Sequence, residues 1–90
     1  MALALLTTTA FVRDLRRLKK QGKDLDKLDV LVTLLQDQQP LPSRYRAHRL
    51  RGNWAAHWDC HVEPDWLLLY QLTEKEIILV RSGSHAELFG

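Results

Sequence analysis

The chain has 90 residues, of which 46% are hydrophobic and 27% are charged, and its formal net charge is +2. This length predicts one domain over residues 1–90, and the composition excludes a disordered protein. No apolar run approaches the ~18 residues that a transmembrane helix needs, so we expect a soluble, cytoplasmic protein with no membrane partner. The single cysteine, Cys60, excludes an internal disulfide and a multi-cysteine zinc site, and we expect it to be a small core residue.

The first part of the chain predicts a short strand and a helix. Residues 3–7 are typical of a strand, and Thr8 or Thr9 then offers a side-chain oxygen that can cap a helix. Apolar side chains recur along that helix, with helical spacing, at Phe11, Leu15 and Leu18.

A second helix is predicted after Gly22, which suits a left-handed helix end, and Asp24, which can cap the next helix. Its apolar face consists of Leu25, Leu28, Leu31, Val32, Leu34 and Leu35. We expect the two helices to pack as a hairpin.

The second half of the chain predicts strands. Pro40 and Pro42 stop helix formation, so residues 38–52 are expected to form an extended, Arg-rich loop that carries Tyr45 and His48. Residues 54–61, 66–72 and 76–81 are typical of an antiparallel meander. A turn is predicted at residues 83–84, and a closing turn or edge segment at residues 86–89. This order predicts an α+β fold in which an N-terminal strand and a two-helix hairpin pack on a twisted antiparallel sheet, leaving one face for function.

Ten of the thirteen basic residues fall in two short segments. Residues 13–23 contain six of them and one acid, Asp14, while residues 44–51 contain four and no acid. A solvated helix face beside a basic loop would explain each segment singly, but two such segments in so short a chain favour a nucleic-acid partner. The residues expected to contact RNA phosphates are Arg16, Arg17, Lys19 and Lys20.

Polar side chains that can carry chemistry gather in the first strand of the meander. Because side chains alternate along a strand, one face is predicted to carry His57, Asp59, His61 and Glu63. The other face is predicted to be core, with Trp58, Cys60 and Val62.

Of three kinds of chemistry that this cluster could support, one fits its residues best. A metal site on His57, Asp59 and His61 is weakly indicated, because the nearby arginines oppose a cation and paired cysteines are missing. A Cys60 nucleophile is disfavoured, since the adjacent His61 would point to the opposite face. Cleavage of RNA without metal or other cofactor fits better, because histidine and arginine supply a base for the 2′-hydroxyl, an acid for the leaving oxygen and a cation for the phosphate.

Three segments closely resemble the YafQ branch of the RelE/ParE toxin superfamily. They are Gly52-Asn53-Trp54, the run from Asp59 to Tyr70 that contains His-Val-Glu-Pro-Asp-Trp, and the run from Arg81 to Phe89 that contains Gly-Ser-His. The resemblance covers essentially the whole chain. It implies a RelE-like fold and an endoribonuclease toxin of a type II toxin-antitoxin pair, which cuts mRNA in the ribosomal A site.

The resemblance also implies roles for individual residues. His85 would be the general acid, and the base and its orientation would come from His48, His61 and Asp65, without further division among the three. Arg81 would bind the scissile phosphate, Phe89 would stack on or position a base, and Asp59 would orient His61 or the substrate backbone. His57 has no such role and is expected to be an ordinary exposed histidine.

The expected partners are a cognate antitoxin protein, the ribosome through its 16S rRNA, and mRNA. The main rival from another class is a non-catalytic ParE-like toxin that binds a protein such as gyrase. Such a toxin would not need three histidines and Asp65 together, so this function ranks second. A plain RNA-binding module is a third possibility, favoured only by the basic segments.

Overall fold

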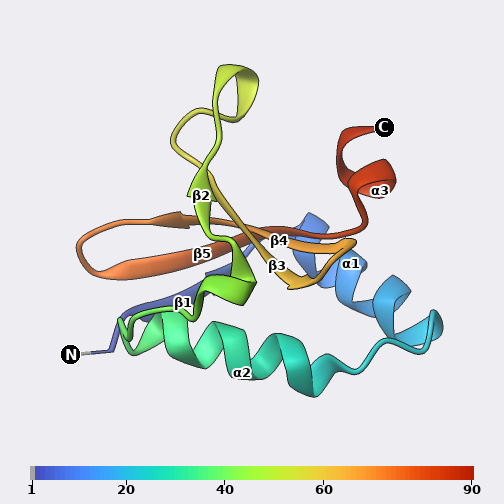
Figure 1. Ribbon diagram of the computed structural model, residues 1–90, viewed down its shortest axis with the longest axis horizontal. Coiled ribbons are helices and arrows are strands. Elements are labelled where there is room, and N and C mark those ends of the chain that lie inside the picture. The colour runs from blue at the N-terminus through green and yellow to red at the C-terminus, as the bar shows by residue number, and fades with distance from the viewer. Residues whose placement is uncertain (1) are drawn as a thin grey trace.

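The computed structural model describes residues 2–90, which form a five-stranded sheet, three α-helices and two short 3-10 helices (Figure 1). In chain order these are β1 (Ala4–Thr7), α1 (Thr9–Lys20), α2 (Leu25–Gln36), η1 (Ser43–Tyr45), β2 (His48–Arg49), η2 (Gly52–Trp54), β3 (Trp58–Glu63), β4 (Trp66–Leu72), β5 (Glu76–Gly83) and α3 (His85–Phe89).

The strands lie in the order β1-β5-β4-β3-β2. The strands β2 to β5 are antiparallel neighbours, as predicted. However, β1 runs parallel to β5, with Ala4 opposite Glu76 and Thr7 opposite Leu79. The sheet is therefore mixed, and the prediction of a purely antiparallel sheet is wrong. Strand periodicity specifies which side chains share a face, but it does not specify the direction of a partner that is distant in sequence.

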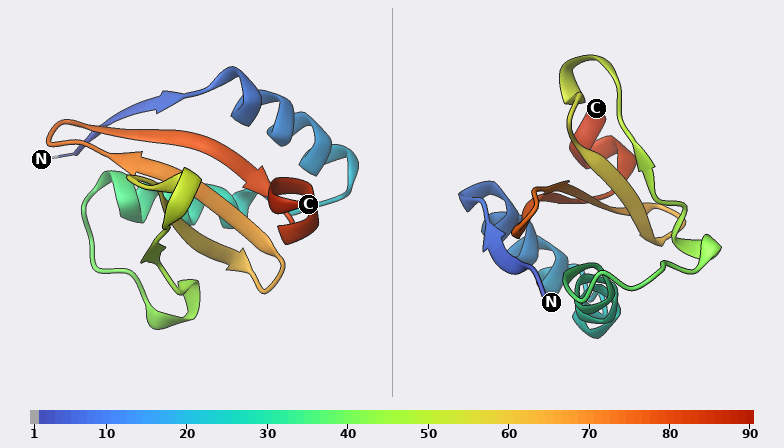
Figure 2. Two further views of the ribbon diagram at one scale, coloured as in Figure 1. Left: turned by 90° about the horizontal axis from the view of Figure 1, so that it is seen from above. Right: turned by 90° about the vertical axis from the view of Figure 1, so that its left-hand side faces the viewer.

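The helices and loops form a layer on each face of the sheet. The long helix α2 covers one face, while α3 and the segment from residue 50 to residue 57 lie on the other (Figures 1 and 2). The larger hydrophobic cluster, on the α2 side, joins α1 and α2 to the sheet through residues that include Phe11, Leu18, Leu31, Cys60, Trp66 and Tyr70. The smaller cluster, on the other side, contains Leu67, Leu69 and Leu88, with Leu50, Trp54 and Val80 packed against them. Cys60 is fully buried, as expected.

The predicted helix ends are confirmed at both helices. The Thr8 side chain accepts a hydrogen bond from the Phe11 amide at 3.0 Å, and the Asp24 side chain accepts one from the Asp26 amide at 3.0 Å. Gly22, between the helices, has a φ of +77°, which side chains other than glycine rarely adopt. Both helices contribute to the larger cluster, although α1 lies beside β5 rather than flat on the sheet.

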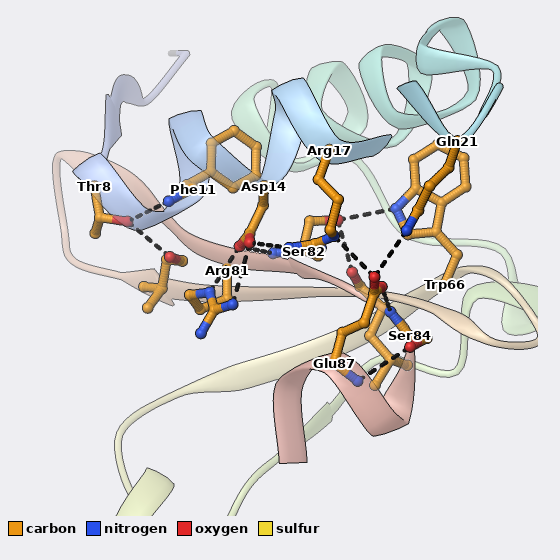
Figure 3. A network of polar contacts seen from close by, with 12 residues as sticks. Thr8, Phe11, Asp14, Arg17, Gln21, Trp66, Arg81, Ser82, Ser84 and Glu87 are labelled. Atoms are coloured by element: carbon orange, nitrogen blue, oxygen red, sulfur yellow. Dashed lines mark hydrogen bonds and ion pairs between the residues drawn. The ribbon is translucent and has the colours of Figure 1, made fainter. Parts of the chain in front are cut away.

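Side chains of α1 complete the edge of β5 that β1 leaves open. The strand β1 pairs only with residues 76–79, so the following residues of β5 have a neighbouring strand, β4, on one side only. The Thr8 hydroxyl donates to the Val80 carbonyl at 2.7 Å, Asp14 accepts from the Ser82 amide at 3.0 Å, and Arg17 donates to the Ser82 carbonyl at 2.7 Å (Figure 3). These bonds satisfy an edge that would otherwise be unpaired.

Several segment boundaries differ from the sequence predictions. The strand expected over residues 54–61 begins at Trp58, because η2 and a turn with Ala56 at φ 72° precede it. The loop expected over residues 38–52 contains η1 and β2. Residues 86–89 belong to α3, because Ser84 and Glu87 form a reciprocal capping box at its start.

Candidate active site

Three of the predicted site residues share one row across the sheet. His48 on β2 pairs with Asp59 on β3, Asp59 pairs with Leu69 on β4, and Leu69 pairs with Arg81 on β5. Residues paired in this way present their side chains on the same face. Because Leu69 belongs to the smaller cluster, this row lies on the face that carries α3 and not on the face covered by α2.

Four side chains were predicted to share one face of β3. The middle two are on that face, and the outer two are not. Asp59 and His61 lie on the predicted face. His57 precedes β3, and its ring packs edge-on against Trp54 with centroids 5.3 Å apart. A bulge between His61 and Glu63 breaks the alternation. The Glu63 carboxylate therefore pairs with Lys23 and Lys27, at 3.2 Å and 2.8 Å.

Asp59 and His48 form the inner pair of the site. The Asp59 carboxylate is almost fully buried, with 6% of its side chain exposed, and its Oδ1 lies 2.9 Å from Nδ1 of His48. The same nitrogen lies 3.0 Å from the carbonyl oxygen of Arg46, so Nδ1 is the inward-facing nitrogen of this ring. Burial raises the pKa of Asp59, although charged His48, His61 and His85 would lower it.

His61, His85 and Asp65 form the outer part of the site. The rings of His61 and His85 have centroids 5.6 Å apart. Nδ1 of His85 lies 2.6 Å from Oδ1 of Asp65, which also accepts from the His85 amide at 2.9 Å. The pKa of Asp65 is lowered, first by the bond from the His85 backbone and then by the bond from its ring. Nδ1 of His61 lies 3.2 Å from the Pro64 carbonyl oxygen. Each ring thus engages the protein through Nδ1, which leaves Nε2 as the nitrogen for a substrate.

Arg81 is held by Asp14 rather than extended over the centre of the row. Asp14 Oδ2 accepts from Nε of Arg81 at 2.7 Å, and Asp14 Oδ1 accepts from a terminal nitrogen of Arg81 at 3.1 Å (Figure 3). Asp14 is 2% exposed, whereas the Arg81 side chain is 29% exposed. A guanidinium has five N–H donors, so three remain for another ligand after these two bonds.

Arg17 differs from the other predicted RNA-contacting residues. Its guanidinium bonds to Asp14 at 2.7 Å and to the Ser82 carbonyl, and its Nε lies 2.9 Å from Glu87 of α3. It therefore connects α1, β5 and α3, and little of its charge is left to face a polyanion. The remaining members of that set are exposed on α1, namely Arg16, Lys19 and Lys20.

Phe89, the last residue of α3, is partly exposed. It is 44% exposed, and its ring packs edge-on against Trp54 with centroids 5.9 Å apart. The contact joins the end of α3 to the segment before β3. An exposed aromatic ring at this position is available for stacking.

The sequence prediction missed Asp14 and Arg46. Asp14 lies three residues after Phe11 and four before Leu18, on the apolar side of its helix, and an acid on a buried stripe is a signal of pairing. Arg46 gave no comparable signal, because its importance lies in a left-handed φ of 48° and in the carbonyl that contacts His48.

Two kinds of feature are absent from residues 2–90. The described chain has no group of three or more His, Cys, Asp or Glu side chains placed to hold a metal ion. None of the helices formed by these residues is both long enough and apolar enough to cross a membrane.

Nearly the whole chain matches one known family of bacterial toxins. Residues 3–90 match the family model described as the bacterial toxin of type II toxin-antitoxin system, YafQ. The mRNA interferase toxin YafQ of Escherichia coli strain K12 is 46% identical over 81 residues, which cover 89% of this chain and 88% of that protein.

Solved structures of related toxins have the same fold. YafQ from E. coli strain BL21(DE3) superposes with a TM-score of 0.94 at 40% identity, covering 98% of this chain and 99% of the other. The toxin chain of the E. coli DinJ-YafQ complex gives 0.92 at 41% identity, with both chains covered completely. A metal-bound toxin from Helicobacter pylori gives 0.91 at 43% identity, covering 97% and 99% of the two chains. The chain therefore belongs to the YafQ family of bacterial toxins from type II toxin-antitoxin systems.

Proposed function

We propose that this protein is an endoribonuclease, an mRNA interferase toxin that cuts mRNA in the ribosomal A site. The observation that carries the proposal is the pair of histidine rings 5.6 Å apart on one face, one of them bonded to a carboxylate. Two imidazoles at this separation can serve the two ends of a single phosphodiester. The relative from E. coli is named as an mRNA interferase, in agreement with this chemistry.

The proposed reaction is attack of the ribose 2′-hydroxyl on the adjacent phosphorus. A general base removes the 2′-hydroxyl proton, the new P–O2′ bond forms, and the P–O5′ bond breaks. His85 gives its Nε2 proton to the departing 5′-oxygen, and Asp65 keeps the ring turned so that Nε2 faces the substrate. The products are a 2′,3′-cyclic phosphate and a 5′-hydroxyl. One proton is removed from the 2′-hydroxyl and one is added to the 5′-oxygen, so the protons balance.

The role of general base is assigned to two histidines on the same face as His85. His61 is the nearer histidine, and His48 beside the buried Asp59 is the second. Oδ1 of Asp59 lies 2.9 Å from Nδ1 of His48, so this carboxylate would stabilise the imidazolium that proton removal creates. The free N–H groups of Arg81 would bind the non-bridging phosphate oxygens, and Phe89 would stack on a base.

The proposed partners follow from the same assignment. A cognate antitoxin would hold the toxin inactive, as the name of the E. coli DinJ-YafQ toxin-antitoxin complex suggests. The ribosome would present the mRNA, contacting the protein through 16S rRNA, so the toxin would act in the cytoplasm. No metal or other cofactor has a part in the proposed steps.

Cleavage of a defined mRNA on purified ribosomes tests the proposal. We expect the wild-type protein, treated with EDTA and returned to ribosomes that keep their magnesium, to produce 2′,3′-cyclic phosphate and 5′-hydroxyl ends. His85→Gln should lower the single-turnover rate by about 10² to 10⁴ without loss of ribosome binding. His57→Gln is the matched control, because His57 packs against Trp54 outside the cluster. Growth arrest without cleavage would instead support a toxin that acts by binding a protein such as gyrase.

A further inference from the structure

A groove of about 620 Å³ adjoins the proposed active site on the side away from Arg81. Its walls come from α2, from η1 with the residue after it, and from the end of β3 with the first residue of the following turn. The residues that matter for its chemistry are Val30, Arg44, Tyr45, Arg46, His61 and Pro64. A volume of this size lies within the range of small-ligand sites, which is roughly 300 to 1,000 Å³.

The surface of the groove combines an apolar lining with basic side chains. Val30 is 55% exposed, and Val62 and Pro64 add further apolar surface. The Arg44 guanidinium lies 4.9 Å from the centre of the Tyr45 ring and donates to its hydroxyl at 3.0 Å. Glu63 is the one acid in the lining, and its charge is neutralised by Lys23 and Lys27. An apolar lining with net positive charge suits a nucleobase and its phosphate.

Arg46, which lines the groove, has a strained backbone conformation. Its φ of 48° lies in the left-handed region, where glycine or asparagine would be less strained. Its backbone is needed there, because its carbonyl lies 3.0 Å from Nδ1 of His48. Its exposed side chain has no hydrogen bond or ion pair within residues 2–90. An unpaired guanidinium therefore stands in the groove, on the residue that holds a proposed catalytic histidine.

His61 connects the groove to the proposed reaction. It lines the groove and also faces His85, so a nucleotide in the groove would be next to the phosphate between the two histidines. We infer that this groove binds the nucleotide adjoining the scissile phosphate, with Arg46 as the ligand of that nucleotide's own phosphate. The inference rests on the proposed ribonuclease function and adds a second nucleotide position to it.

Arg46→Asn tests the inference, because asparagine tolerates the left-handed turn while the guanidinium is removed. The variant should melt no lower than the wild type, since the strain at residue 46 is reduced. In ribosome-dependent cleavage, KM should rise about tenfold or more, as expected for loss of a charge-assisted bond to phosphate, with a smaller change in kcat. Lys75→Asn is the control, since it removes one positive charge from an exposed turn that lies outside the groove and outside both basic segments. Its KM should change less than twofold.

A binding experiment separates this inference from the proposed function. A non-cleavable 2′-O-methyl RNA trinucleotide should shift the NMR signals of Val30, Val62 and Tyr45 in the wild type and in Lys75→Asn, but much less in Arg46→Asn. Equal shifts in both variants, or equal KM values, would overturn the inference while leaving wild-type cleavage intact. Loss of antitoxin affinity in Arg46→Asn with unchanged RNA binding would also overturn it, because the groove would then belong to a protein partner.

Discussion

Asp14 accepts hydrogen bonds from three groups on two elements, which are the Arg81 and Arg17 side chains and the Ser82 amide. Burial alone would raise the pKa of Asp14, but these hydrogen bonds outweigh burial and hold the pKa below its usual range. The stabilisation is therefore present above the ordinary pKa of about 4 and is lost as the pH falls through the lowered value. At neutral pH the carboxylate is charged, and it fixes the direction of Arg81.

We predict that Asp14→Asn slows cleavage through Arg81. Arg81→Ala should lower kcat by about 10² to 10³, the usual effect of removing a donor to transition-state charge. Asp14→Asn should cause part of that loss, because Asn no longer accepts a charge-assisted bond from Nε. The double variant should be no slower than Arg81→Ala alone. Additive losses, measured well below each variant's melting temperature, would show that Asp14 acts independently of Arg81.

Asp59 has the opposite pH behaviour from Asp14. Its folded pKa is raised, so its charge opposes folding at neutral pH, and this penalty disappears as the pH falls below its ordinary range. We predict that Asp59→Asn melts at the same temperature as the wild type or higher at pH 7, yet cleaves at least tenfold more slowly. The difference in melting temperature should shrink towards pH 3. A variant that is less stable at pH 7 and more stable in acid would contradict the assignment.

The site residues predicted from the sequence lie mainly in the segments that resemble the YafQ family, as His61, Asp65 and His85 do. Their mutual placement agrees with a shared site, although their roles remain predictions. Arg17 was assigned to RNA because its segment is basic, but its contacts depend on where β1 ends beside β5. That end point is a tertiary property, and no local pattern in the sequence encodes it.

The short helix α3 positions His85 at its first residue. The Ser84 side chain accepts from the Glu87 amide at 3.1 Å, and the Glu87 side chain accepts from the Ser84 amide at 2.8 Å. A five-residue helix has little stability of its own, so this capping box and the burial of Leu88 define it. The orientation of His85 towards Asp65 follows from the same local structure.

We predict that Ser84→Ala lowers the free energy of unfolding by about 1 kcal/mol, which is typical of an N-cap loss. Cleavage should fall as well, because the His85 amide and ring would no longer be held against Asp65. Ser84→Asp, which keeps a capping oxygen, should restore most of both properties. Thermal melting and single-turnover cleavage measure the two effects. Full activity in Ser84→Ala would show that α3 does not position His85.

The helices and the antiparallel strands β3 to β5 were predictable because apolar periodicity and turn residues agree along those segments. The parallel pairing of β1 was not, since its partner lies about seventy residues away and all four residues of β1 are exposed, so no buried face specifies a direction. The start of β3 was misplaced because Ala56 adopts a left-handed conformation that alanine rarely occupies.

The two basic segments lie at opposite ends of the strand order, with the proposed site between them. Residues 44–51 run along the β2 edge, and α1 lies beyond the end of β1 against β5. Figure 2 shows these two segments apart, on either side of the central strands. Positive charge on both flanks would hold an RNA backbone across the face that carries His61 and His85.

We predict that replacing Arg16, Lys19 and Lys20 with Gln weakens ribosome binding and reduces its dependence on salt. For every phosphate that the variant no longer neutralises, the slope of log K against log salt should decrease by about 0.7. Arg17 is left unchanged because it bonds to Asp14 and Glu87. Lys75→Gln, in the turn at the other end of the sheet, is the control and should leave the slope as it is. An unchanged slope in the triple variant would remove α1 from the binding surface.

The position of β5 between β1 and β4 affects how the protein folds as it is synthesised. Among the strands of residues 2–90, β5 is translated last, yet β1 has no other strand to pair with, and Arg81 and His85 lie on or just after β5. The nascent chain can form its helices early, but the sheet closes only after β5 leaves the exit tunnel, because contacts distant in sequence form late. Arg81 and His85 therefore reach their places only once β5 has paired, so the proposed site would be the last part of the sheet to form.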